Sequence, residues 1–220
     1  MNWSEIGNGY RKHRPEGTPA RLFWLGLALF FAGAFLKITW ELHEDAGVDR
    51  WDKALLLWVA SHRVQRLNGS AVDVTALGSP VVLLLFTLLG GLGLALKRDW
   101  PGFAYLVGGS AGAGLITYVL KHIFTRPRPE IVPRLVEVTG YSYPSGHSLA
   151  GTSFYLLVMF LAWRAYSKWA HRLAWLVTAS VLIAGIGFSR GYLGVHNPSD
   201  VLSGILLGAS WSCVLTSWYF

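Results

Sequence analysis

Hydrophobic residues are concentrated in six long stretches that are almost free of charge. The stretches are residues 22–40, 74–96, 100–120, 148–163, 173–189 and 201–220, and Lys37 is the only charged residue inside them. A helix that crosses the roughly 30 Å hydrocarbon core of a bilayer needs about 17–25 apolar residues, and five of the stretches meet that length. The fourth is one residue short, so we expect its helix to extend back into Gly146 and His147. The pattern predicts six membrane spans.

These spans are predicted to be helices. Backbone polar groups in lipid must be satisfied internally, and barrel strands would alternate apolar with polar residues rather than run apolar throughout. The expected fold class is therefore all-α: a polytopic membrane protein with six transmembrane helices in a bundle, forming one domain over residues 1–220. Residues 1–21 form a polar head, and the run at 22–40 is too long for the apolar region of a signal peptide, so we expect an uncleaved span.

A shorter amphipathic run lies between the first two spans, inside the polar segment 41–73. From Trp51 to Leu67, apolar residues such as Trp58 and Val59 recur at helical spacing, with charged residues beside them. Trp side chains favour the membrane–water interface. We therefore expect an amphipathic helix lying on the outer leaflet, with a lid or wall for a lipid substrate as the alternative interpretation.

The composition supports a membrane protein and excludes other classes. Only 14% of the residues are charged and 53% are hydrophobic, with 11 Trp, whereas a soluble domain has about 25% charged residues. The long uncharged runs leave no polar face for a soluble helix. The net charge of +7 is not gathered into a basic arm or patch. A soluble domain, a disordered chain and a nucleic-acid-binding protein are excluded, and the lipid bilayer is the expected surrounding.

The charges near the span ends indicate an orientation. With a cytoplasmic N-terminus, one side holds nine Lys and Arg and three acids, a net charge of 9 − 3 = +6, while the other side holds ten and nine, a net charge of +1. The Lys and Arg counts of the two sides nearly tie, so the positive-inside rule does not by itself give the orientation. It gives a cytoplasmic N-terminus only if several of the outer cations serve another purpose and are left out of the count. We expect a multi-pass protein of the cell (inner) membrane with both termini in the cytoplasm.

Three polar clusters border the spans, and this topology places all three on the outer (periplasmic or extracellular) side. They are Lys121–Pro129 after the third span, Tyr143–His147 at the start of the fourth, and Ser189–Asp200 between the fifth and sixth. Lys and Arg side chains together suit a dense anion, because Arg binds phosphate through two parallel hydrogen bonds. Ser145 and Gly146 at a helix start add backbone N–H donors. The clusters therefore predict a phosphate site.

Two histidines in these clusters allow one nucleophile and one general acid. His196 and Asp200 are four residues apart, and if Asn197 caps the sixth helix with Pro198 in its first turn, the carboxylate can reach the imidazole and fix its tautomer. The set favours phosphoryl transfer without a metal. A metal site built from His147, His196 and Asp200 is the alternative, although the adjacent cations would repel the ion. Taken singly, Lys121, Arg126 and Arg128 could also simply contact lipid headgroups.

The three clusters together resemble the signature of the type 2 phosphatidic acid phosphatase (PAP2) superfamily. The family motifs are Lys-x6-Arg-Pro, Pro-Ser-Gly-His and Ser-Arg-x5-His-x3-Asp. In the same order and spacing, the chain contains Lys121…Arg128-Pro129, Pro144-Ser145-Gly146-His147 and Ser189-Arg190…His196…Asp200. The motifs cover about 25 residues, and the six-span layout extends the resemblance along the chain.

This resemblance implies a role for each motif residue. His196 would form a phosphohistidine, Asp200 would orient it, and His147 would protonate the leaving lipid alcohol. The phosphate oxygens would be held by the remaining motif residues, which are Lys121, Arg128, Ser145, Gly146 and Arg190. No metal or other cofactor is expected. Arg126 begins a second Arg-Pro pair that the family spacing does not select, so we interpret it as a lipid headgroup contact.

The resemblance further implies an integral membrane phosphatase that hydrolyses the terminal phosphate of a lipid phosphate or diphosphate. Undecaprenyl diphosphate is the first candidate substrate, because that carrier is released at the outer face; phosphatidylglycerophosphate and phosphatidic acid are the others. A lipid phosphotransferase with the same site is the nearest alternative. An anion transporter or channel would need ionisable groups along its pathway, and the spans contain only Lys37. The sequence does not indicate the oligomeric state.

Overall fold

A computed structural model describes residues 17–44 and 47–219, and all regular secondary structure in those residues is helical. This confirms the all-α prediction; the residues 1–16 of the predicted polar head lie outside the described residues. The helices are α2 (Gly17–His43), α3 (Val48–Ser61), the 3-10 turn η1 (Gln65–Leu67), α4 (Asn68–Ala76), α5 (Pro80–Leu96), α6 (Trp100–Phe124), α7 (Gly146–Ala165), α8 (Trp169–Tyr192) and α9 (Pro198–Tyr219).

Five of these helices are long and apolar enough to cross a membrane, and a bent pair makes a sixth candidate if its two halves count as one span. The prediction of one continuous span over 74–96 was wrong in that respect. Helix α4 ends at Ala76 and α5 starts anew at Pro80, with a bend of 44° between η1–α4 and α5. The cause is local: Ser79 caps α5 by accepting a hydrogen bond from the Val82 N–H at 3.3 Å, and proline has no N–H to continue the preceding helix.

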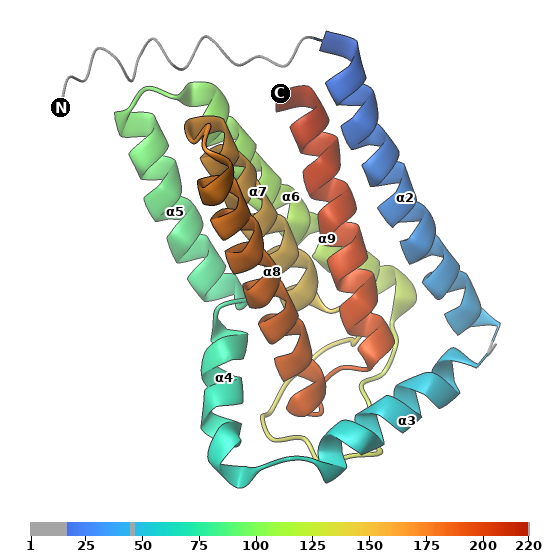
Figure 1. Cartoon of the computed structure of the whole chain (residues 1–220). Helices are drawn as coiled ribbons and strands as arrows, with labels where there is room; N and C mark the ends of the chain where they lie inside the picture. Colours follow the sequence, from blue (N-terminus) through green and yellow to red (C-terminus); the bar gives the residue numbers. More distant parts are fainter. Residues whose placement is uncertain (1–16, 45–46, 220) are drawn as a thin grey trace.

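The other spans lie where the sequence predicts them but extend beyond the uncharged stretches. Helix α6 continues to Phe124 and carries Lys121 in its last turn, α8 carries Arg190, and α9 begins early enough to include Asp200. Helix α7 begins at Gly146, as expected. The charged residues of the three clusters therefore project from helix ends or from the adjoining loops, at one end of the bundle (Figure 1).

Helices α7 and α9 form the buried centre of the bundle, and α2 packs along α9 (Figure 1). The two central helices approach closely through glycines of α9. A Cβ atom on Gly204 would lie 2.6 Å from the carbonyl oxygen of Ser145, and one on Gly208 would lie 2.6 Å from that of Leu149. Small residues allow backbones in a membrane to pack tightly, and here this contact fixes the start of α7 against the start of α9.

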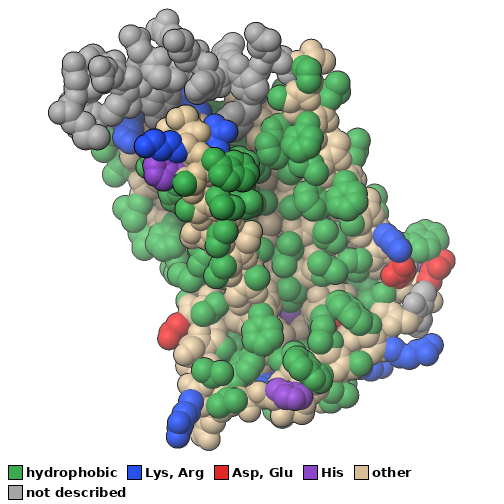
Figure 2. Space-filling view, viewed as in Figure 1, with side chains coloured by type: hydrophobic (Ala, Val, Ile, Leu, Met, Phe, Trp, Pro, Cys, Tyr) green, Lys and Arg blue, Asp and Glu red, His purple; other side chains and the backbone are tan. Residues whose placement is uncertain are grey.

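The face of the bundle seen in Figure 2 is apolar over its middle, and charged side chains gather nearer its two ends. Large hydrophobic side chains are exposed on several spans, among them Leu29, Leu84, Leu115 and Val181. A soluble protein does not expose contiguous apolar surface on this scale. The pattern fits helices whose outward faces contact lipid.

Helix α3 runs across the end of the bundle that carries the long loop between α6 and α7 (Figure 1). The predicted amphipathic helix from Trp51 to Leu67 was too long, since α3 ends at Ser61. There the Ser61 hydroxyl and the His62 ring both contact the Trp58 carbonyl oxygen, at 2.8 Å each, and the chain turns away. Trp51 and Trp58 are exposed, as an interfacial helix requires.

Candidate active site

A cavity of about 690 Å³ lies between α5, α6 and α7 and reaches the loop end of the bundle. One part of its wall is polar and comes from all three sequence clusters: Lys121, Arg128, Gly146, His147, Arg190 and His196. The remainder is mainly apolar and includes Leu84 and Leu88 of α5 and Val107 and Ala111 of α6. The structure thus gathers residues from widely separated parts of the chain into one pocket with a cationic end and an apolar wall.

His196 lies in the loop between α8 and α9, and its side chain is only 2% exposed. Its Nδ1 atom is 3.4 Å from Asp200 Oδ2 and 3.3 Å from the Ser142 hydroxyl oxygen. Its Nε2 atom is 3.2 Å from Arg128 Nη1, a group that can only donate. The neutral ring is therefore protonated at Nδ1, with the Nε2 lone pair directed to the Arg128 side, where the cavity lies.

Burial lowers the pKa of His196 to about 4, and the positive charges of Arg190 and Arg128 act in the same direction, against the opposing effect of Asp200. The imidazole is consequently neutral at neutral pH. A nucleophile needs an unprotonated lone pair, and Nε2 of His196 has one, which here accepts a hydrogen bond from Arg128. Its surroundings suit nucleophilic attack by that atom.

Asp200 is fully buried behind His196 and does not line the cavity. Its Oδ2 atom accepts hydrogen bonds from the Ser142 hydroxyl at 2.5 Å and from the Asn197 N–H at 2.9 Å. Pro198 begins α9, and the backbone carbonyl oxygen of Asn197 before it accepts the Val201 N–H at 3.2 Å; capping by the Asn197 side chain stays a prediction. The carboxylate therefore holds both the start of α9 and the imidazole.

Arg128 and Lys121 are fixed by the loop between α6 and α7. Arg128 donates to the carbonyl oxygens of Gly140 and Thr139 at 3.0 Å each and to that of Val195 at 2.9 Å. Lys121 Nζ donates to the carbonyl oxygen of Tyr141. Burial lowers the pKa of Arg128, while Asp200 opposes the shift; a guanidinium nevertheless stays charged. Both cations are held in place before any ligand arrives.

Arg190 is 3% exposed, and its guanidinium still has hydrogen-bonding capacity. Its Nη1 group donates to the Thr75 hydroxyl of α4 at 2.8 Å, whereas its buried Nε has no partner among the described residues. Buried polar groups in proteins are almost always hydrogen-bonded. Arg190 also lines the cavity, so its guanidinium is placed to meet an anionic ligand there.

Ser145 and Gly146 form the start of α7, and only Gly146 lines the cavity. The Ser145 hydroxyl caps the helix by accepting a hydrogen bond from the Ser148 N–H at 3.4 Å. The backbone N–H of Ser145 donates to the Asp200 carbonyl oxygen at 2.9 Å. A Cβ on Gly146 would lie 2.9 Å from a methyl group of Thr117, so glycine permits the close approach to α6. The predicted phosphate contact of Ser145 stays a prediction; the structure shows it capping the helix that carries His147.

Residues 102–220, which contain all three clusters, match the family model described as the PAP2 superfamily. The chain belongs to the PAP2 superfamily. Its first and second motifs border the loop between α6 and α7, and its third joins α8 to α9. The resemblance drawn from the motifs is confirmed, and with it the assignment to a family of membrane phosphatases that act on lipid phosphates.

Two relatives and one solved structure define the similarity. Phosphatidylglycerophosphatase B of Bacillus subtilis is 32% identical over 176 residues, covering 79% of this chain and 85% of the relative. An undecaprenyl-diphosphatase of Sulfolobus acidocaldarius is 28% identical over 201 residues, covering 88% and 89%. The crystal structure of a PAP2-type phosphatidylglycerolphosphate phosphatase from Bacillus subtilis superposes with a TM-score of 0.80 and 28% identity, covering 87% and 94%.

Several residues around the PAP2 motifs were missed by the sequence analysis. Ser142 contacts both His196 and Asp200, and Thr75 holds Arg190; neither position carries a signal in the sequence. The interpretation of Arg126 as a headgroup contact is not what the structure shows: its guanidinium lies 2.6 Å from Asp200 Oδ1 in an ion pair. The repeated Arg-Pro pair was the available signal for Arg126.

The described residues contain no group of three or more His, Cys, Asp or Glu side chains arranged to hold a metal ion. Asp200 forms an ion pair with Arg126 and accepts hydrogen bonds from the Ser142 hydroxyl and the Asn197 N–H. That the site works without a metal stays a prediction, which activity in the presence of EDTA would test.

Proposed function

We propose that this protein is a membrane phosphatase that removes the terminal phosphate from a lipid phosphate or diphosphate. The observation that carries the proposal is the division of the cavity into a cationic end and an apolar wall. Lys121, Arg128 and Arg190 suit the phosphate, and the apolar side chains of α5 and α6 suit the hydrocarbon chain of the same molecule. A soluble phosphate ester would not need that second wall.

In the proposed reaction, His196 Nε2 attacks phosphorus, and the bond between phosphorus and the lipid oxygen breaks. His147, which lines the same cavity, donates a proton to the departing oxygen. Water then attacks phosphorus and cleaves the P–N bond; His147 takes a proton from that water, phosphate departs and His196 is restored. Asp200 stabilises the positive imidazole ring of the intermediate, as the carboxylate of a catalytic triad does.

Two substrates have specific support. Undecaprenyl diphosphate is the first candidate, because we propose that the site faces the outer side, and the relative that is an undecaprenyl-diphosphatase matches 88% of the chain. Phosphatidylglycerophosphate is the second, because the relative named phosphatidylglycerophosphatase B is 32% identical. Phosphatidic acid completes the set for comparison.

Purified protein in detergent should release inorganic phosphate from at least one of these three lipids in the presence of EDTA. The reaction needs only side chains, so we expect chelation to leave the rate unchanged. Phosphate release and loss of the lipid substrate would be measured for each lipid at equal concentration. No release from any lipid would contradict the proposal. A rate lost in EDTA and restored by a divalent metal would support the metal-site alternative, and transfer of phosphate to an added alcohol would indicate a phosphotransferase.

We also propose that the end of the bundle carrying α3 and the site faces outward, with both termini in the cytoplasm. The starts of α2, α6 and α8 and the end of α9 gather at the opposite end (Figure 1). A reporter fused after Phe220 should therefore read as cytoplasmic, and one inserted at Glu137 in the exposed loop should read as external. The reverse pair of readings would invert the orientation.

A further inference from the structure

Arg126 lies between two buried carboxylates that belong to different helices. It follows α6 in the chain, and its Nη1 group is 2.6 Å from Asp200 Oδ1 on α9 while its Nη2 group is 2.9 Å from Asp52 Oδ2 on α3. Asp52 is 1% exposed and Asp200 is 0% exposed. The flat guanidinium fork suits this two-sided contact, which a lysine could not reproduce. One cation therefore links the interfacial helix to the carboxylate behind His196.

Asp52 also holds the first turn of α9 directly. Its Oδ1 atom accepts the Ser199 N–H at 2.8 Å, and its Oδ2 atom accepts the Ser199 hydroxyl at 2.5 Å. Ser199 immediately precedes Asp200, and its hydroxyl oxygen accepts from Arg126 at 2.8 Å. A buried carboxylate is costly unless it is fully paired, and every contact of Asp52 named here is directed to Arg126 or to the residue beside Asp200.

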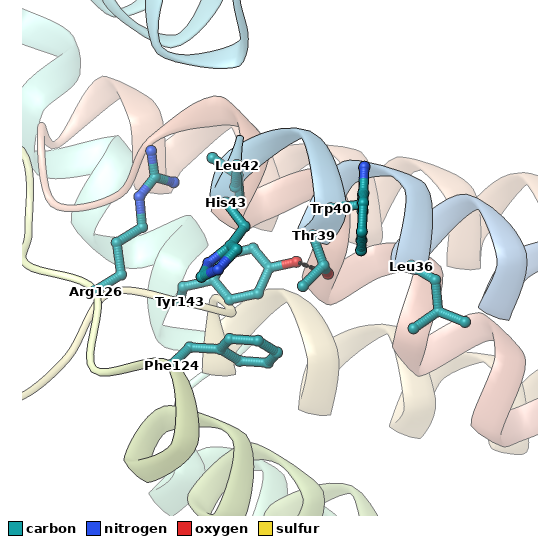
Figure 3. A pocket seen from close by; sticks show the side chains of 8 residues that line it. All are labelled: Leu36, Thr39, Trp40, Leu42, His43, Phe124, Arg126 and Tyr143. Carbon is teal, nitrogen blue, oxygen red and sulfur yellow. Dashed lines mark hydrogen bonds between the residues drawn. The ribbon is translucent and has the colours of Figure 1, made fainter. Parts of the chain in front are cut away.

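Arg126 lies on the far side of Asp200 from the substrate cavity. It lines a second cavity of about 560 Å³ beside the C-terminal end of α2, next to Phe124 and Tyr143 (Figure 3), and it does not line the cavity that contains His196. Asp200 uses Oδ1 for Arg126 and Oδ2 for the side of His196. The Arg126 side chain therefore reaches the imidazole through this carboxylate, while the Arg126 carbonyl oxygen accepts the N–H of Ser142 at 2.8 Å.

We propose that Arg126 and Asp52 are positioning residues that hold Asp200 ionised and in the orientation that His196 needs. The inference rests on the proposed function, because it assigns a role in that reaction. Arg126 fixes Oδ1 of the carboxylate, and Oδ2 then faces Nδ1 of His196 while it accepts from Ser142 and Asn197. Its positive charge also favours the ionised carboxylate, which stabilises the imidazolium-like intermediate. Helix α3 thus contributes to turnover without contacting the lipid phosphate.

The test compares kcat and KM for four purified variants, with kcat normalised to the folded fraction. Arg126→Gln should lower kcat about 10- to 100-fold, the range known for residues that orient metal-binding side chains, with KM unchanged because Arg126 does not contact substrate. Arg126→Lys should recover part of the loss, since it restores charge without the fork. Asp52→Asn should lower kcat less, because Arg126 keeps its bond to Asp200. Arg134→Gln is the matched control in the same loop, bonded to the Pro129 carbonyl, and should match wild type.

Each outcome decides the inference. A wild-type kcat in folded Arg126→Gln, or a raised KM with kcat retained, would overturn it, because Arg126 would then be dispensable or a substrate ligand. If Arg126→Gln does not fold, Arg126→Lys and Asp52→Asn decide instead: both must turn over more slowly than Arg134→Gln at unchanged KM. If wild type releases no phosphate, or if His196→Ala stays active, the proposed function itself fails. Measurements on these two proteins alone reveal that failure, so it is distinct from a failure of the inference about Arg126.

Discussion

Replacing His196 with alanine should abolish phosphate release while leaving the protein folded. The variant lacks the only imidazole that the structure pairs with Asp200 and Arg128 in the described residues. Loss of a covalent nucleophile typically costs a factor of about 10⁴ or more in kcat. The measurement is phosphate release from the best lipid of the panel, with the elution profile of the purified protein in detergent as the test of folding.

His122→Ala is the matched control for this variant. His122 also lies near the site end of α6, but it is exposed, and the contacts of its ring within the described residues are with the Tyr118 carbonyl and the Tyr118 and Tyr141 rings. We expect near wild-type turnover from this control. If His196→Ala kept substantial turnover, the nucleophile assignment would have to be abandoned.

Replacing His147 with glutamine should slow the reaction in a way that depends on the leaving group. His147 is the second residue of α7 and lines the cavity together with His196. As the general acid, it should contribute about 10²- to 10⁴-fold with a lipid alcohol as the leaving group. With 4-nitrophenyl phosphate the loss should be much smaller, because nitrophenolate departs without a proton.

The ratio of the two rates gives the decisive comparison. In His147→Gln the rate with 4-nitrophenyl phosphate should fall far less than the rate with the lipid, whereas in His196→Ala both should fall together. Equal losses with both substrates in His147→Gln would show that this residue does not act by protonating the leaving group.

The membrane spans could be predicted because lipid imposes a strong and local rule on sequence: long runs without charge. The helix bounds that were predicted wrongly also depend on local sequence, but there two signals compete. Ser79 and Pro80 form a standard helix start, yet they lie inside a run, 74–96, whose continuous apolar character indicates a single helix. The end of α3 at Ser61 depends on side-chain contacts with the Trp58 carbonyl, which hydrophobic spacing does not encode.

The candidate site likewise contains residues that the sequence could predict and residues that it could not. Residues proposed to meet the phosphate lie in short motifs, so their spacing could be recognised in the sequence. The residues that support them act across long distances along the chain: Thr75 is 115 residues from Arg190, and Asp52 is 147 residues from Ser199. Asp52 in the sequence is one charged residue of an amphipathic run, and only the packing of α3 against α9 shows that it is buried.

The first turn of α9 has a consequence for engineering this protein. Active-site groups commonly lower stability, so that their removal yields a more robust but inactive protein. Here Asp200 also accepts the Asn197 N–H and so completes the helix start, as an acidic residue in the third helical position does in a capping box. Thermal tolerance and turnover should therefore decline together at this turn. Stabilising substitutions are better sought on the lipid-facing surfaces of α2 and α8.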